Sequence, residues 1–162
     1  MEITETTALL RLGVSLVLGA AIGLEREYHR HPAGLRTFTL ITVSSTMAML
    51  VSIYICEQHP HLLNGDPGRI AAQVLTGIGF IGAGLILKHA DGVTVLTTAA
   101  CIFSAACIGL AAGAGMILTS VVLTCVVVVI LLSSSFIHAR HRRQPPKDPK
   151  APQDTPGFDD RA

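Results

Sequence analysis

The residues of this chain best able to do chemistry are a few polar side chains set inside long apolar runs. Arg69, Gln73 and Gly77 recur at intervals of four in DPGRIAAQVLTGIGFIGAGLIL, so on a helix they share one face. A guanidinium or an amide is expensive in hydrocarbon and needs a partner or a water-filled site. Asp66, which precedes Pro67, is suited to cap this helix. Two interpretations stay open: a capped helix whose Arg69 reaches the membrane surface, or a functional polar site.

A second polar group lies in the first connection, GLEREYHRHPAGLRT. Glu25 and Arg26 end one apolar run, and Arg36 and Thr37 begin the next. Four such residues at the ends of two adjacent runs predict a compact turn held together by ion pairs.

A third group consists of small hydroxyl and thiol side chains near the start of the fourth apolar run. Thr94, Thr97, Thr98 and Cys101 are spaced three, one and three residues apart and so line one face of a helix. Threonines in this setting usually hydrogen-bond to their own backbone or to a neighbouring helix. The simpler interpretation is therefore that this face has a structural role.

A metal site has to be weighed in the segment EQHPHLLNGDPGR. A hard cation such as magnesium prefers carboxylate oxygens, which makes Glu57 and Asp66 weak candidate ligands. His59 and His61 could instead respond to acidic pH, or the segment could simply be a solvated loop. We therefore expect no resident metal and no cofactor, with sensitivity to magnesium left open.

The elements that position these residues follow from composition and length. Half of the residues are hydrophobic and 14% are charged, which indicates an integral membrane protein. The runs are long enough to cross a bilayer as helices, so we expect an all-α, polytopic bundle of five transmembrane helices. The five predicted spans are Ala8 to Leu24, Leu35 to Ile55, Ile70 to Leu87, Val93 to Ala112 and Met116 to Ile137.

The basic residues predict the orientation of the chain in a bacterial inner membrane. Placing the N-terminus outside and the C-terminus in the cytoplasm leaves Arg11 and Arg69 outside and the other ten of the twelve basic residues inside. Residues 1–137 then form one membrane domain, and the proline-rich, charged residues 138–162 form a disordered cytoplasmic tail. Basic residues at the start of that tail could also contact anionic lipid headgroups.

Glycine dominates the predicted helix contacts, because small residues let helix backbones approach closely. Two GxxxG pairs occur, and the third span has so little bulk that we expect it to be the central helix of the bundle. The predicted packing residues are Gly19, Gly23, Gly77, Gly79, Gly82, Gly84, Gly109 and Gly113.

These segments together resemble a known family. GLEREYHRHPAGLRT, DPGRIAAQVLTGIGFIGAGLIL and LTTAACIFSAACIGLAAGAG are similar, in order and spacing, to the signature blocks of the bacterial MgtC/SapB family of inner-membrane proteins. The resemblance implies five spans and a link to adaptation to low magnesium and, in some members, to virulence and survival inside host cells. Longer members carry an ACT-like soluble domain, so this chain resembles a short form. The polar positions that match the family are Glu25, Arg26, Arg36, Thr37, Asp66, Arg69, Gln73, Thr97 and Thr98.

Two functions stay open. The first is a non-enzymatic regulator that contacts other inner-membrane proteins and itself, as a homo-oligomer or dimer, through small-residue faces. The second is a transporter or channel for magnesium or a small solute, with a polar path along spans three and four. An enzyme is not expected, because the chain has no carboxylate pair within a span and neither HExxH nor GxSxG. The expected surroundings are membrane lipids, with no nucleic acid.

Overall fold

The computed structural model of the protein describes residues 4–59, 66–88 and 92–141, with side chains for 4–59, 66–87 and 95–133. Within these ranges the chain is all-α, as predicted. Each helix encloses one of the predicted apolar runs to within a residue, and α1, α2 and α5 continue through polar residues beyond the C-terminal end of the run. The helices are α1 (Glu5–Tyr28), α2 (Leu35–Gln58), α3 (Gly68–Lys88), α4 (Gly92–Gly113) and α5 (Ile117–His141).

Four helices, α1 to α4, are long and apolar enough to cross a membrane, which makes the chain a multi-pass membrane protein. In α5 the described side chains form a shorter apolar section, Ile117–Ser133, so the fifth span remains a prediction. The backbone of α5 continues to His141, four residues past the predicted end of the domain, and residues 138–141 are therefore helical rather than part of a tail. The rest of the predicted tail, 142–162, and His61 of the predicted outer loop lie outside the described residues.

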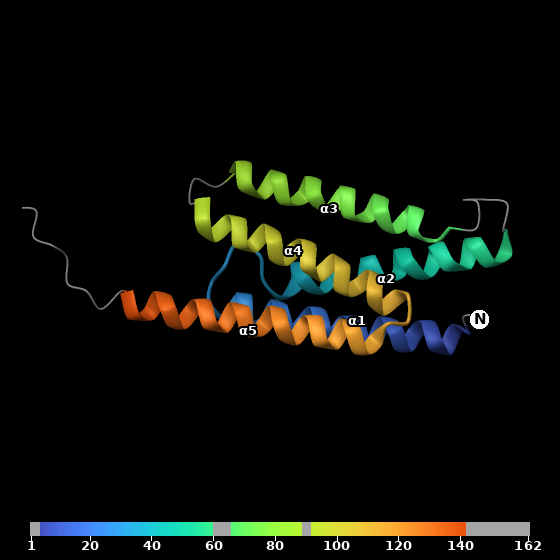
Figure 1. Cartoon of the computed structure of the whole chain (residues 1–162), viewed down its shortest axis with the longest axis horizontal. Helices are drawn as coiled ribbons and strands as arrows, with labels where there is room; N and C mark the ends of the chain where they lie inside the picture. The colour runs from blue at the N-terminus through green and yellow to red at the C-terminus, as the bar shows by residue number, and fades with distance from the viewer. Residues whose placement is uncertain (1–3, 60–65, 89–91, 142–162) are drawn as a thin grey trace, which may run out of the picture.

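The central helix of the bundle is α4, and the expectation that the third span would be central is wrong. Helix α4 packs against each of the other four helices, whereas the extensive contacts of α3 are with α4 and α2. Figure 1 shows α3 at one edge of the bundle and α1 with α5 toward the opposite edge. In the apolar windows, 56% of α4 is buried but only 11% of α3.

The two GxxxG pairs both pack closely against α2. A Cβ added at Gly23 would lie 2.6 Å from the Leu35 Cα, and one at Gly19 would lie 2.7 Å from the Thr42 hydroxyl. On α4, a Cβ at Gly109 would meet the Thr42 carbonyl oxygen, and one at Gly113 would lie 2.7 Å from the Thr46 carbonyl oxygen.

The glycines of α3 differ in their surroundings. A Cβ at Gly82 would make ordinary contact with Ala99 of α4 at 3.6 Å, so this glycine packs inside the bundle. Gly77, Gly79 and Gly84 have no atom within 4 Å of an added Cβ, so no described residue packs on them. Their small size is not needed for packing within one copy of the chain.

Hydroxyl groups link the helices, and most of them come from α2. The Thr46 hydroxyl donates to the Gly109 carbonyl at 2.8 Å, which ties α2 to α4. The Ser52 hydroxyl donates to the Pro67 carbonyl at 2.8 Å, which ties α2 to the start of α3. Because helical carbonyls and hydroxyls have no water to bond in hydrocarbon, such bonds stabilise the chosen helix register.

Two short turns close antiparallel helix pairs in the same way. After α1, His31 N–H donates to the Arg26 carbonyl and Arg30 N–H to the Glu27 carbonyl, both at 3.0 Å. After α4, Met116 and Gly115 repeat this pattern with the carbonyls of α4. Both are Schellman ends, which place one residue in the left-handed region. That residue is Gly115, at φ 91°, in one turn but Arg30, at φ 55°, in the other.

Candidate functional site

Arg26 is the most deeply buried charged side chain among the described residues, with 2% of its surface exposed. It lies in the last turn of α1, the helix that ends at Tyr28. Its Nη2 donates a hydrogen bond of 3.1 Å to the Oγ1 of Thr98, which is fully buried on α4. The structure thus joins two of the predicted polar residues across 72 positions of sequence. A buried guanidinium needs such partners, because burying an unpaired charge is strongly unfavourable.

Glu25 brings an opposite charge to the same place. Its side chain is 7% exposed, and its Oε1 lies 3.1 Å from the Nδ1 of His29, one turn along α1. When that Nδ1 carries a proton, it donates to the Glu25 backbone carbonyl at 3.0 Å. Both carboxylate oxygens and the Nε of Arg26 are buried and lack a hydrogen-bond partner among the described groups. We call the charged cluster of Glu25, Arg26 and Thr98 the Arg26 cluster. The buried atoms of Glu25 and Arg26 that lack a hydrogen bond reduce the stability of the fold.

The loop that follows the Arg26 cluster is built on Glu27. The Leu35 N–H, at the start of α2, donates to the Oε2 of Glu27 at 2.9 Å, so this carboxylate caps α2 from α1. The predicted ion-pair turn is thus held by this cap and by the backbone bonds after α1, and it has no described ion pair that includes Arg36. Burial, Arg26 and His29 together lower the pKa of His31 below its ordinary value.

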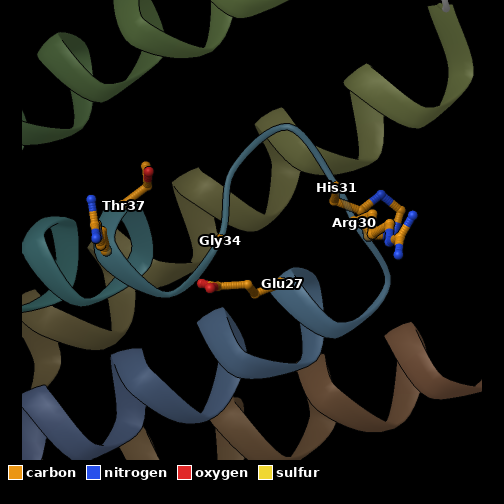
Figure 2. Close-up of a pocket in the computed structure, with 6 residues that line it drawn as sticks. Glu27, Arg30, His31, Gly34 and Thr37 are labelled. Carbon is orange, nitrogen blue, oxygen red and sulfur yellow. The ribbon is translucent and has the colours of Figure 1, made fainter.

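An open depression of about 490 Å³ surrounds this loop. In Figure 2, Glu27 points toward Gly34, while Arg30 and His31 extend away from Thr37 on the far side of the loop. The charged groups diverge, so they do not form a pocket around one ligand. The lining residues are Glu27, Arg30, His31, Gly34, Arg36 and Thr37.

The opposite end of the bundle, where α2 ends and α3 begins, holds Asp66, Arg69 and Gln73, whereas Thr97 adjoins Thr98 at the Arg26 end. Asp66 Oδ1 accepts a hydrogen bond of 2.8 Å from the Gly68 N–H, which confirms that it caps α3. Arg69 and Gln73 are exposed on α3, and Thr97 is exposed on α4. The nine predicted polar positions are therefore divided between the two ends of the bundle.

The weak metal candidates show no shared geometry. Glu57 and Asp66 are both exposed, one at the end of α2 and the other just before α3. No group of three or more His, Cys, Asp or Glu side chains comes together within the described part of the chain. We identify no residues there that would hold a metal or a cofactor.

The sequence interpretation missed a set of buried hydroxyls on α2. Thr42, Ser45, Thr46 and Ser52 are all buried, and together they face the glycines of α1 and α4 and the start of α3. Their spacing of three, one and six residues along a helix was the available signal. Arg11 was likewise treated only as a charge outside the membrane, whereas its Nη1 donates to the Gly113 carbonyl at 2.7 Å.

Comparison with known proteins identifies the family to which the chain is similar. Residues 12–140 match the model of the MgtC family. Protein SapB of Bacillus subtilis (strain 168) is 47% identical over 110 residues, which cover 66% of this chain and 47% of that protein. Protein MgtC of Brucella abortus (strain 2308) is 40% identical over 115 residues, which cover 70% and 45% of the two chains.

A third relative has a name that states a function. The putative magnesium transporter YhiD of Escherichia coli (strain K12) is 45% identical over 113 residues, covering 67% of this chain and 51% of that protein. The chain spans about half the length of these curated relatives. No solved structure matches it significantly. With the family model covering residues 12–140 and an all-α, multi-pass fold, the chain belongs to the MgtC/SapB family of membrane proteins.

Proposed function

We propose that this protein is a non-enzymatic regulator in the bacterial inner membrane, which acts by lateral contact with other membrane proteins during adaptation to low magnesium. The observation that carries the proposal is the uncovered outer face of α3. This helix packs on α4 and α2 from one side only, and its other side presents exposed Gln73 beside open Gly77.

Such a face is poorly suited to lipid. An amide in hydrocarbon loses its hydrogen bonds to water, at a free-energy cost of several kcal/mol on an alkane scale, roughly 4–8. A glycine inside a helix also costs about 1 kcal/mol relative to alanine and here gains no packing within the chain. A second helix laid against α3 would supply a partner for Gln73 and would fill the space above Gly77.

Contacts within the chain favour this function over conduction of a cation by a single copy. Between α3 and α4, Gly82 lies against Ala99 at ordinary contact distance. At the far end of the predicted path, the guanidinium of Arg26 is bonded to Thr98 and would repel a divalent cation. A magnesium transporter remains the second candidate, supported by the name given to the Escherichia coli relative.

The proposal includes an orientation with the N-terminus outside and the C-terminus in the cytoplasm. This places the Arg26 cluster at the cytoplasmic surface and the Asp66 cap at the outer surface. It is supported by the excess of basic residues on the cytoplasmic side.

The test is growth at limiting magnesium in a strain that lacks the protein. Gln73→Leu should reach the membrane in normal amounts yet lose its support of growth, because the α3 face can no longer pair. Ser44→Leu is the matched control, since Ser44 is an exposed polar residue on α2, and it should support growth fully. Full growth with Gln73→Leu would show that the α3 face is not the working contact.

A further inference from the structure

The outer face of α3 carries one continuous stripe of residues at helical spacing. Its members recur at intervals of four, four, three, four and three, so they stay on one side of the helix. Gly82 lies on the opposite side, against Ala99 of α4. The α3 stripe, as we call it, consists of Arg69, Gln73, Gly77, Phe80, Gly84 and Leu87, all exposed.

We propose that the occupant of the α3 stripe is a second copy of this chain, so that two α3 helices pack together about a two-fold axis. This inference rests on the proposed function and names the first partner in it. The reasons are the position of Gln73, the shape of the stripe and its charges.

The first reason is depth. Two copies inserted with the same orientation can be related only by an axis along the membrane normal, so each residue of one α3 lies level with the same residue of the other. Gln73 of one copy then meets Gln73 of the second copy. A carboxamide both donates and accepts, so it can pair with an identical group. An unrelated partner would need its own polar residue at this depth.

The second reason is shape. Phe80 is 82% exposed and stands between Gly77 and Gly84, where an added Cβ would meet nothing. The stripe thus has a projecting ring at Phe80 with a hollow on each side of it, at Gly77 and at Gly84. Where two symmetric helices cross, each phenyl ring can lie to one side of the two-fold axis and enter a glycine hollow one turn away on the other copy. Lipid tails gain no comparable contact from a glycine hollow.

The third reason is charge. Asp66 precedes Arg69 by three residues and caps the start of α3, so this end of the helix carries one negative and one positive group. In a two-fold arrangement each Arg69 faces the same end of the second copy, where an Asp66 is also present. Together with its Asp66 cap, this end of α3 is therefore neutral overall and compatible with the same end of a second copy. Arg69 without Asp66 beside it would repel the Arg69 of a second copy.

The test is disulfide cross-linking in native membranes. The exposed and half-buried thiols, Cys56, Cys107 and Cys125, are first replaced by Ala, while buried Cys101 stays. Phe80→Cys then reports on the stripe. Ile81→Cys is the matched control, because Ile81 is the next residue of the same helix, 49% exposed but turned off the stripe.

The proposal predicts a covalent dimer for Phe80→Cys that is several-fold more abundant than for Ile81→Cys. Adding Gly77→Leu should remove the dimer while the single copy still folds, because the new side chain enters open space. Equal cross-linking at both positions, or none at Phe80→Cys, would overturn the second copy as occupant.

The outcomes also separate this inference from the proposed function. A cross-link from Phe80→Cys to a protein of different mass would overturn the dimer but leave regulation by lateral contact standing. A dimer lost in Gly77→Leu with growth at low magnesium unchanged would support the dimer and count against the proposed function.

Discussion

The Nη2 of Arg26 and the Oγ1 of Thr98 are 3.1 Å apart, although 72 residues separate them in the chain. This bond fastens the last turn of α1 to the central helix α4, at the end of the bundle where Glu25 is also buried. The bond joins two of the polar residues that the sequence predicts to be functional.

Thr98→Val should destabilise the protein by about 1.5–3 kcal/mol, because the buried guanidinium loses a charged hydrogen bond while the side-chain volume is kept. Thermal unfolding of the purified protein in detergent measures the change. Thr119→Val is the control, since Thr119 is exposed on α5, and should lie within about 0.5 kcal/mol of the parent. Equal effects of the two substitutions would argue against a stabilising role for the Arg26 bond.

The effect of a glycine-to-alanine substitution on stability should depend on its position. Gly23→Ala places a Cβ 2.6 Å from the Leu35 Cα, which is backbone, so α1 and α2 must separate and stability falls by about 1–3 kcal/mol. Gly79→Ala meets nothing within 4 Å and lies off the α3 stripe, so it should raise stability by up to about 1 kcal/mol through helix propensity. Unfolding in detergent again gives both values. A loss with Gly79→Ala as large as with Gly23→Ala would contradict the packing described for α3.

Arg30→Gly should stabilise the turn after α1. Arg30 has φ 55°, a left-handed conformation that costs an L-residue about 1 kcal/mol or more and costs glycine almost nothing. We expect a gain of about 0.5–1 kcal/mol, partly offset by the entropy of glycine in the unfolded chain. Arg30→Ala removes the same charge but keeps a Cβ, so it should give no gain. Equal gains in both variants would point to the charge rather than to the backbone.

His31 should make the fold sensitive to acid. Its pKa in the folded protein is lowered by burial, by Arg26 and by His29, so as pH falls below the ordinary value of about 6.5 the unfolded chain takes up the proton first. The contribution of neutral His31 to stability is thus complete above that pH and is lost as pH falls toward the lowered pKa. Melting temperatures between about pH 7 and 5 should fall less for His31→Gln than for the parent. The same slope in both proteins, with exposed His59→Gln as control, would exclude His31 as the source.

The helices could be predicted well because length and apolarity alone set them. Apolar runs of bilayer length gave all five, and Asp66 before Pro67 gave the start of α3. The ends were less predictable, since α5 continues through polar residues to His141 and the Schellman turn at Arg30 has no glycine.

Spacing could not tell which helix a small residue faces. Gly19, Gly23, Gly109 and Gly113 do pack closely, but all four use α2, which has no GxxxG pair of its own. The glycines of α3 indicated a central helix for the same reason, and yet three of the four, Gly77, Gly79 and Gly84, lie beside open space. A small side chain permits close approach without specifying the partner, which can be another helix of the chain or of another copy.

The sequence could predict which residues belong to the candidate site, but not which of them contact one another. Glu25, Arg26 and Thr98 were each marked by their type, whereas the contact between α1 and α4 that brings them together depends on tertiary packing. Arg69 and Gln73 lie at the other end of the bundle from Arg26, because α3 begins where α2 ends.

Magnesium flux into proteoliposomes tests the central claim, regulation by contact rather than conduction, most directly. The purified protein, its Gln73→Leu variant and empty vesicles are compared with a magnesium-sensitive dye inside. Our account predicts the same flux in all three, with the protein shown to be folded by its melting transition. Magnesium entry that requires the protein and is lost in Gln73→Leu would contradict it and would establish a transporter whose path runs along α3.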